Sequence, residues 1–280
     1  MKLEQAIDEF MLNAELNTKQ GTMDFYNSYT SKIYNYYGDI DIETINRYSI
    51  LKFLKSEKVR NPDISNATLN KIVLVVKGVL KYSGVSLEFS KLKEKQKIRV
   101  TISPGIIKKI FSYYEGATLN TELRNYTYLR LLHDTGLRLN EMNNILLCNV
   151  DLDLNTILVT VTKTDLDRYV FFTDDTKYIL LKYMAVFKPT KTLIVNNKHE
   201  QMSTSSVESF ISRLKRKLNI EENISPHQWR HTFATEFLRS GGNIRYLQVI
   251  LGHSRISSTE RYTHPTKVDL LESYKTVHQK

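Results

Sequence analysis

One stretch of the sequence collects histidine and arginine at helical spacing. A Ser-Pro pair precedes HQWRHTFATEFL and is typical of a helix start, because the hydroxyl can cap the helix and proline suits its first turn. His227 and Arg230 then lie on one helical face, where they could exchange a proton and hold a phosphate oxygen. His227 and His231 are also four residues apart, a spacing at which two histidines can bind zinc. A zinc site is disfavoured, because the metalloprotease motif requires glutamate directly after the first histidine and this sequence has Gln228 there. His231 is interpreted as a packed structural residue.

A second candidate group lies in LLHDTGLR. Gly136 is expected to end one helix, and Arg138 stands at the start of the next. The free N–H groups of a helix start, together with a guanidinium, favour an anion such as phosphate. By itself this motif is weak, because an arginine after a helix-ending glycine is usually a surface residue.

The segment LGHSRISSTERYTH supplies a possible nucleophile. His253 follows a glycine, and Tyr262 comes nine residues later. The phenol of an ordinary tyrosine has a pKa of about 10 and is a poor nucleophile at neutral pH. Tyr262 is one of 17 tyrosines, so only the motifs before it single it out.

The order of these motifs resembles that of the tyrosine recombinase family: TGLR with Glu141, a lysine in a β-hairpin turn, HxxR, GH, and a tyrosine nine residues later. The resemblance spans the chain in outline and is most specific from Arg138 to Tyr262. It implies a catalytic set of Arg138, Lys163, His227, Arg230, His253 and the nucleophile Tyr262. Glu141 is then expected to orient neighbouring groups rather than to react.

The assignment of Lys163 depends only on its place directly after the first strand of the hairpin. Members of the family commonly have glycine beside this lysine, whereas Thr162 and Thr164 flank it here. Arg168 remains the competing basic residue of the hairpin.

These residue types suit attack on a DNA phosphodiester. Two guanidinium groups can hold the phosphate oxygens as negative charge develops, a role for Arg138 and Arg230 with a further hydrogen bond from His253. His227 is expected to exchange the phenol proton, and Lys163 to protonate the departing 5′ oxygen. The phosphate stays esterified as a 3′-phosphotyrosine, so neither ATP, nor a metal, nor another cofactor is expected.

Periodicity predicts a mainly helical, α+β fold with two domains. Residues 1–90 are expected to form a module of four helices, at 3–16, 22–37, 44–56 and 67–82, and the family resemblance implies that it is a core-binding, SAM-like domain. Residues 103–280 are expected to form the catalytic domain, with helices at 104–115, 121–135, 139–147, 175–187, 204–218, 226–240 and 243–251. Strands at 156–162 and 168–172 form the hairpin, and a short strand near 148–151 completes a three-stranded antiparallel sheet.

Between these domains we expect a basic linker at residues 91–102. It could lie along a DNA backbone or be a solvated charge run, which is the commoner meaning of such segments. Its candidate DNA-binding residues are Lys91, Lys93, Lys95, Lys97 and Arg99.

The net charge and composition of the chain agree with a nucleic-acid partner but do not prove one. The formal net charge of +10 favours a polyanion, although a basic enzyme of another kind would look similar. The single Cys148 excludes an intramolecular disulfide, and the sequence contains neither a signal peptide nor an apolar run long enough to span a membrane. We therefore expect a cytoplasmic, nucleoid-associated protein.

The family resemblance implies site-specific recombination of double-stranded DNA carrying paired sites, by a homotetramer or by a heterotetramer with a second recombinase. The short chain resembles Xer-type enzymes or transposon-encoded resolvases. Residues 265–280 could dock on a neighbouring subunit or pack on their own domain. The alternatives are a type IB topoisomerase, a DNA-binding protein of the same fold that no longer cleaves, and a helix-turn-helix regulator, which would leave the motif order unexplained.

Overall fold

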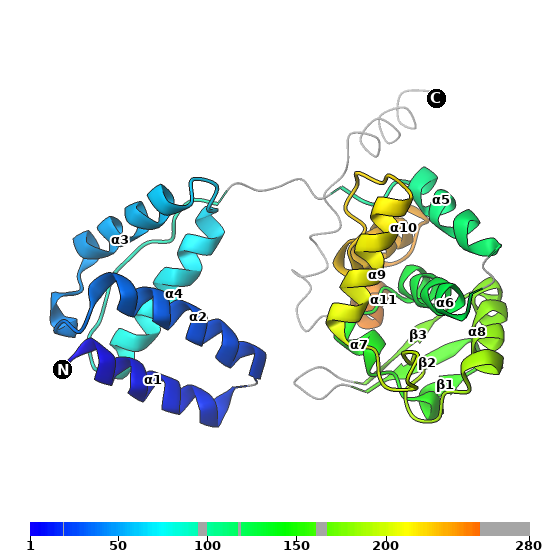
Figure 1. Ribbon diagram of the computed structural model, residues 1–280, viewed down its shortest axis with the longest axis horizontal. Coiled ribbons are helices and arrows are strands. Elements are labelled where there is room, and N and C mark those ends of the chain that lie inside the picture. The colour runs from blue at the N-terminus through cyan, green and yellow to red at the C-terminus, as the bar shows by residue number, and fades with distance from the viewer. Residues whose placement is uncertain (19, 95–99, 117–118, 161–166, 253–280) are drawn as a thin grey trace. The chain divides into compact units, whose positions relative to one another are not determined.

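The computed structural model describes residues 1–18, 20–94, 100–116, 119–160 and 167–252. The chain divides into two compact units, residues 1–98 and 99–280, each with its own hydrophobic core (Figure 1). The expected linker, residues 91–102, spans the boundary between the units.

The first unit is helical. It contains α1 (Leu3–Asn17), α2 (Gln20–Tyr37), the 3-10 turn η1 (Ile42–Thr44), α3 (Arg47–Arg60) and α4 (Asn66–Tyr82). Helices α1 and α2 pack against each other and against α4, around buried residues that include Ile33, Phe53 and Ile72. The third helix begins later than predicted, because the Asn46 side chain accepts hydrogen bonds from the backbone N–H groups of Tyr48 and Ser49 and so caps it.

The second unit combines helices with one small sheet. Its helices are α5 (Pro104–Glu115), α6 (Asn120–Thr135), α7 (Leu139–Asn143), α8 (Asp174–Phe187), α9 (Thr204–Lys217), α10 (Pro226–Arg239) and α11 (Ile244–Leu251), with a 3-10 turn η2 at Leu147–Asn149. Helix α6 packs against α5, α8 and α10 (Figure 1). Tyr128 on α6 and Trp229 on α10 are fully buried.

The sheet has the order β1 (Val150–Asp151), β2 (Thr156–Val159) and β3 (Arg168–Phe171), and all its pairs are antiparallel. Val159 pairs with Arg168 at the end of the hairpin nearest its turn. The predicted mainly helical fold with a three-stranded antiparallel sheet is confirmed.

Several predicted elements differ in length, among them the first hairpin strand, expected at 156–162, which ends at Val159. The helix expected at 139–147 ends at Asn143, because the chain beyond it pairs with another segment: Leu193 N–H donates to the carbonyl of Ile145, and Leu147 N–H donates to that of Lys191. The strand expected near 148–151 contains only Val150 and Asp151, because the two residues before them, Cys148 and Asn149, belong to the 3-10 turn η2.

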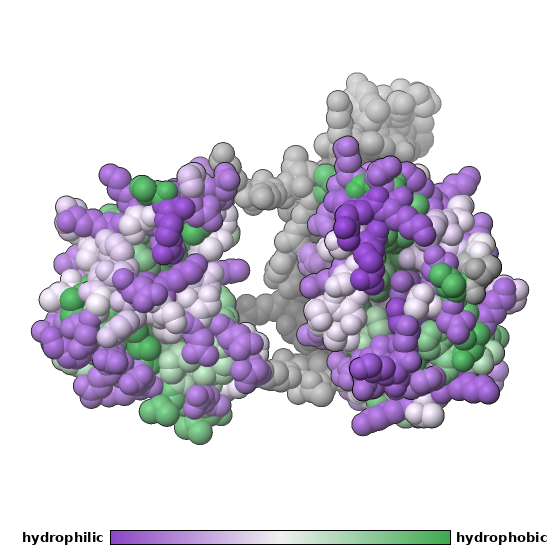
Figure 2. All heavy atoms as spheres, in the orientation of Figure 1, coloured by the Kyte–Doolittle hydropathy of each residue, from purple (hydrophilic) through white to green (hydrophobic). Residues whose placement is uncertain are grey.

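The surface that Figure 2 shows is largely hydrophilic on both units, with apolar residues scattered between. Among the described residues no helix is both long enough and apolar enough to cross a membrane. The same residues contain no cluster of three or more His, Cys, Asp or Glu side chains arranged to hold a metal ion.

Candidate active site

Arg138 begins α7 directly after a tight turn. Gly136 ends α6 with φ +59°, and a Cβ at this position would lie 2.3 Å from Cδ1 of Phe233, so glycine is required for both reasons. The backbone N–H of Arg138 donates to Oε2 of Glu141 at 2.8 Å, and its Nη1 donates to Oε1 at 2.7 Å. The Arg138 side chain keeps 40% of its surface exposed.

Arg230 projects from α10 into the interior, where its side chain is 4% exposed. Its Nη1 donates to the carbonyl of Gly136 at 2.8 Å, and its Nη2 donates to the carbonyl of Leu251 at 2.7 Å. Arg230 therefore joins the TGLR turn to the end of α11.

Glu141 is the anionic centre of this cluster. Beside its contacts with Arg138, its Oε2 accepts a hydrogen bond from Arg168 Nη2 at 2.8 Å and lies 3.9 Å from Nη1 of Arg230. Burial raises the pKa of this carboxyl group, but hydrogen bonds and charge attraction from Arg168 and Arg138 outweigh it, so the pKa lies below its ordinary value. Three guanidinium groups thus surround one carboxylate, which leaves an excess of positive charge suited to phosphate.

The same three arginines also bind the C-terminal turn of α11. Arg168 Nε donates to the carbonyl of Ile250 at 2.7 Å, Arg230 to that of Leu251, and Arg138 Nη2 to that of Gly252 at 3.4 Å. Cations are favoured here, because a helix C-terminus carries partial negative charge. Gly252 has φ +63°, and a Cβ there would lie 2.9 Å from Cζ of Arg168. This explains the glycine of the GH motif, which stands immediately before His253.

His227 lies in the first turn of α10 and is exposed, one residue after Pro226. Neighbouring residues of this helix hold the segment that precedes α5. Gln228 Nε2 donates to the carbonyl of Val100, and the N–H of Ile102 donates to Oγ1 of Thr232 at 2.9 Å.

Glu222 binds the same segment one residue later. Its carboxylate accepts from the backbone N–H of Ser103 at 2.9 Å and from its hydroxyl at 2.8 Å.

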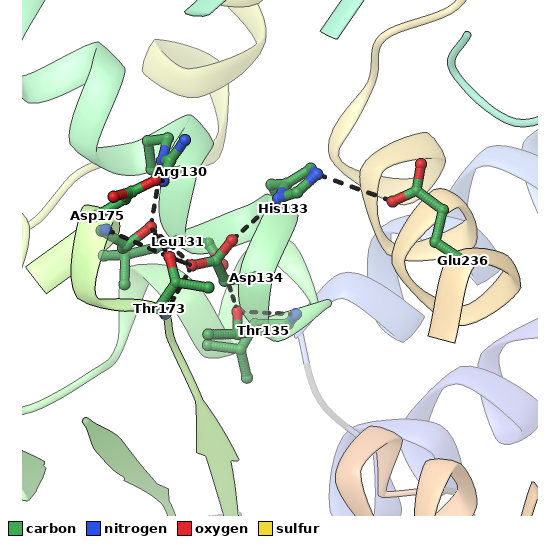
Figure 3. Close-up of polar contacts among 10 residues, drawn as sticks. Arg130, Leu131, His133, Asp134, Thr135, Thr173, Asp175 and Glu236 are labelled. Carbon is green, nitrogen blue, oxygen red and sulfur yellow. Dashed lines mark hydrogen bonds and ion pairs between the residues drawn. The ribbon is translucent and has the colours of Figure 1, made fainter. Parts of the chain in front are cut away.

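Asp134, in the last turn of α6, binds the start of α8. Its carboxylate accepts hydrogen bonds from both the N–H and the hydroxyl of Thr173 and from the hydroxyl of Thr176, at 2.7–2.9 Å, and it lies 2.9 Å from Nδ1 of His133. Figure 3 shows Asp134 between Thr173 and His133, whose other ring nitrogen faces Glu236 on α10. Burial raises the pKa of Asp134, but the hydrogen bonds outweigh it and lower the pKa to about 2.

A largely apolar pocket of about 460 Å³ adjoins this network. It is lined by Phe171, Phe172, Phe233 and Phe237 among others, and by His133, Asp134 and Glu236.

The structure brings together three of the residues singled out in the sequence: Arg138, Glu141 and Arg230. Lys163, His253 and Tyr262 lie outside the described residues, as do Lys95, Lys97, Arg99 and the segment 265–280. Lys91 and Lys93 are exposed on a segment that the side chains of Asn66 and Asn70 hold along α4, through the carbonyls of Lys93 and Leu92.

The sequence analysis named Arg168 only as the alternative to Lys163 in the hairpin, whereas in the structure it is buried and hydrogen-bonded to Glu141. One signal could have placed it. Along β3, Arg168 and Val170 point inward while Tyr169 and Phe171 are exposed, and an arginine on the inward side of an alternating strand requires a buried acidic partner. Asp134 was also missed, because its partners on α8 are distant in sequence.

Comparison with known proteins places this site in a family. Residues 101–268 match the model of the phage integrase family. The chain is 32% identical to tyrosine recombinase XerA of Saccharolobus solfataricus over 79% of this chain and 71% of that protein, and 27% identical to tyrosine recombinase XerA of Pyrococcus horikoshii over 95% and 91%. The structure of the Tn1549 transposon integrase in complex with transposon right end DNA superposes with a TM-score of 0.81 at 16% identity, covering 100% of each chain, which shows a shared fold.

The chain therefore belongs to the phage integrase family. Its similarity to the XerA proteins identifies it as a Xer-like tyrosine recombinase, an enzyme of site-specific DNA recombination, as the order of its motifs predicted.

Proposed function

We propose that Tyr262 breaks and rejoins DNA strands at a phosphate held by Arg138 and Arg230. The phenol oxygen attacks phosphorus, the bond from phosphorus to the 5′ oxygen breaks, and the DNA remains attached as a 3′-phosphotyrosine. Attack by a 5′ hydroxyl of another strand reverses these steps and completes the exchange. The ester linkage is conserved throughout, so joining requires no external energy source.

The observation that supports this proposal is the cluster around Glu141. Its one carboxylate faces three guanidinium groups, and one of them, on Arg138, is 40% exposed and therefore accessible to a phosphate. Arg230 is nearly immobilised by two backbone carbonyls, which suits a group that must be correctly oriented before charge develops.

Proton transfers are assigned by residue type and place. His227 would take the phenol proton and return it in the reverse step, since it is exposed at the start of α10 and an ordinary imidazole titrates near neutrality. Lys163 would protonate the leaving 5′ oxygen, and His253 would donate to a non-bridging oxygen. Arg168, the competing residue of the hairpin, suits this step less well, because a guanidinium group is not deprotonated in proteins whereas a lysine ammonium can give up a proton.

We further propose that double-stranded DNA with paired recombination sites is the substrate, bound by a homotetramer or by a heterotetramer with a second recombinase. The net charge of +10 and the exposed Lys91 and Lys93 support a polyanionic partner. The segment 265–280 is a candidate for contact between subunits, and the nucleoid in the cytoplasm would be the place of action.

Covalent trapping tests the proposal. A cognate duplex is first selected from source DNA by the Tyr262→Phe variant, and a nick within it lets the cleaved fragment diffuse away. We expect a denaturant-resistant adduct with the wild type and with Tyr246→Phe, a control at an exposed tyrosine of α11, and none with Tyr262→Phe. An adduct that persists in Tyr262→Phe, or tight binding without any adduct, would contradict the assignment.

A second site then separates recombination from supercoil relaxation. We expect exchanged products only when two sites are present. Relaxation of a plasmid with one site, without exchange on two, would indicate topoisomerase activity instead.

A further inference from the structure

We propose that Arg168 is a positioning residue for DNA cleavage: it fixes Glu141 and the last turn of α11, so that Arg138 presents its guanidinium to the phosphate. This inference rests on the proposed role of Arg138. It extends that role to a buried residue to which no contact with DNA is assigned.

The contacts of Arg168 join three segments of the second unit, residues 99–280, which we call the catalytic unit. Arg168 is the first residue of β3, at the end of the hairpin nearest its turn, and its side chain is 3% exposed. Its Nη2 donates to Oε2 of Glu141 at 2.8 Å on α7, and its Nε donates to the carbonyl of Ile250 at 2.7 Å on α11. A planar guanidinium can hold two acceptors in a fixed relation, which a lysine ammonium on a flexible stem cannot do as well.

The division of the Glu141 oxygens explains how this affects Arg138. Oε1 accepts from the Arg138 side chain, while Oε2 accepts from Arg168 and from the backbone N–H of Arg138. Without Arg168, Oε2 loses a charged donor, and both oxygens become available to the guanidinium of Arg138. A bidentate pair with Glu141 would then compete with phosphate for that guanidinium.

The last turn of α11 is affected in the same way. Ile250 would lose its donor, while Arg138 is linked to the adjoining Gly252 carbonyl by a long hydrogen bond of 3.4 Å. Loss of Arg168 therefore loosens both fixed points that orient Arg138, while the phosphate contacts assigned to Arg138 and Arg230 remain. We expect the cleavage rate to fall while the affinity for DNA stays nearly unchanged.

The test is a double-mutant cycle between Arg168 and Arg138, read as the single-turnover rate of adduct formation on the nicked cognate duplex. Arg168→Met and Arg168→Lys are compared in the wild-type background and in an Arg138→Lys background, which retains a positive charge at this position. Arg124→Lys is the matched control, because Arg124 is a buried arginine of the same unit whose observed hydrogen bonds go to Asn125 and Asn197. Each protein is also assayed for DNA affinity and, by Trp229 fluorescence, for thermal unfolding.

We expect Arg168→Met to slow adduct formation by roughly 30-fold or more, somewhat less than the roughly 100-fold to 1,000-fold loss of a donor that binds the reacting group directly, because Arg168 acts through Arg138. The rate of Arg168→Lys should lie between those of Arg168→Met and the wild type. In the Arg138→Lys background the same change should cost less than about threefold, because interacting residues are not additive. The dissociation constant for DNA should change by less than about threefold, since no phosphate contact is lost. Arg124→Lys should cleave at the wild-type rate.

Three results would overturn the inference. The first is an equal loss of rate in both backgrounds, which would mean that Arg168 does not act through Arg138. The second is a loss of rate explained by weaker DNA binding. The third is failure of both Arg168 variants to fold, which would mean that Arg168 is required for folding rather than for positioning Arg138. An adduct that survives in Tyr262→Phe would instead contradict the nucleophile assignment, so the two failures are distinguishable.

Discussion

Replacement of Asp134 by asparagine removes the charge that the hydrogen bonds around this carboxylate stabilise. The pKa of Asp134 lies at about 2, against an ordinary value of 3.8. One pKa unit corresponds to about 1.4 kcal/mol, so folding should favour the ionised form by about 2 kcal/mol. The asparagine side chain would also place an amide NH₂ group against the donors of Thr173 and Thr176 unless it turned its oxygen toward them.

The sign of the pH dependence follows from the direction of the shift. A carboxyl group whose pKa is lowered by folding stabilises the protein above the unfolded pKa, and this stabilisation is lost as the pH falls through the folded pKa. The contribution of Asp134 should therefore be complete at pH 7 and pH 5, and should decline progressively from pH 4 toward pH 2.

The chain provides a probe for this measurement. Trp229 is its one tryptophan, is fully buried, and lies in the same unit as Asp134, so its fluorescence reports unfolding of that unit. In urea titrations we expect Asp134→Asn to lower the free energy of unfolding by about 2 kcal/mol at pH 7, and by clearly less at pH 3. Asp175→Asn is the control, because that side chain is 86% exposed and its pair with Arg130 should contribute little.

Equal stability of Asp134→Asn and wild type at pH 7 would refute this account of the network. A difference that stays constant between pH 5 and pH 3 would show that the variant acts through lost packing rather than through the carboxylate charge.

Three further outcomes are expected. Gly136→Ala should destabilise the catalytic unit by more than about 1 kcal/mol in the same urea assay, because a Cβ meets Phe233 and the φ of +59° disfavours alanine; no change would contradict the strained turn. Glu141→Gln should slow adduct formation at least about tenfold with little change in DNA affinity, since an oriented donor is disturbed; an unchanged rate would remove Glu141 from the site. Lys91→Ala and Lys93→Ala should each reduce the slope of log K against log salt by about one if these side chains bind phosphates, and an unchanged slope would exclude both.

The sequence predicted best those parts of the fold that depend on local pattern. Amphipathic periodicity located the helices of both units, and the β-branched hairpin was recognisable from alternating residues. The errors lie where another segment competes for the backbone: the helix expected at 139–147 ends at Asn143, because Ile145 and Leu147 bind the distant residues Leu193 and Lys191 instead.

The site was predictable to a similar extent. The order of the motifs identified Arg138, Glu141 and Arg230 as candidate site residues, and the structure places them in one cluster. The alternation along β3 could have indicated that Arg168 is buried, but not which groups it binds, because its partners on α7 and α11 are brought to β3 only by tertiary folding. The spacing of residues also could not indicate that Asp134 would bind the start of α8.

The attachment of residues 100–103 to the catalytic unit has a practical consequence for dissecting the protein. Ile102 is 1% exposed, and the segment donates to Thr232 and Glu222 and accepts from Gln228. A fragment cut just before α5 would therefore uncover an apolar site and leave these polar groups without their partners. The catalytic unit should be isolated with its N-terminal boundary at or before Val100, although its first regular helix begins at Pro104.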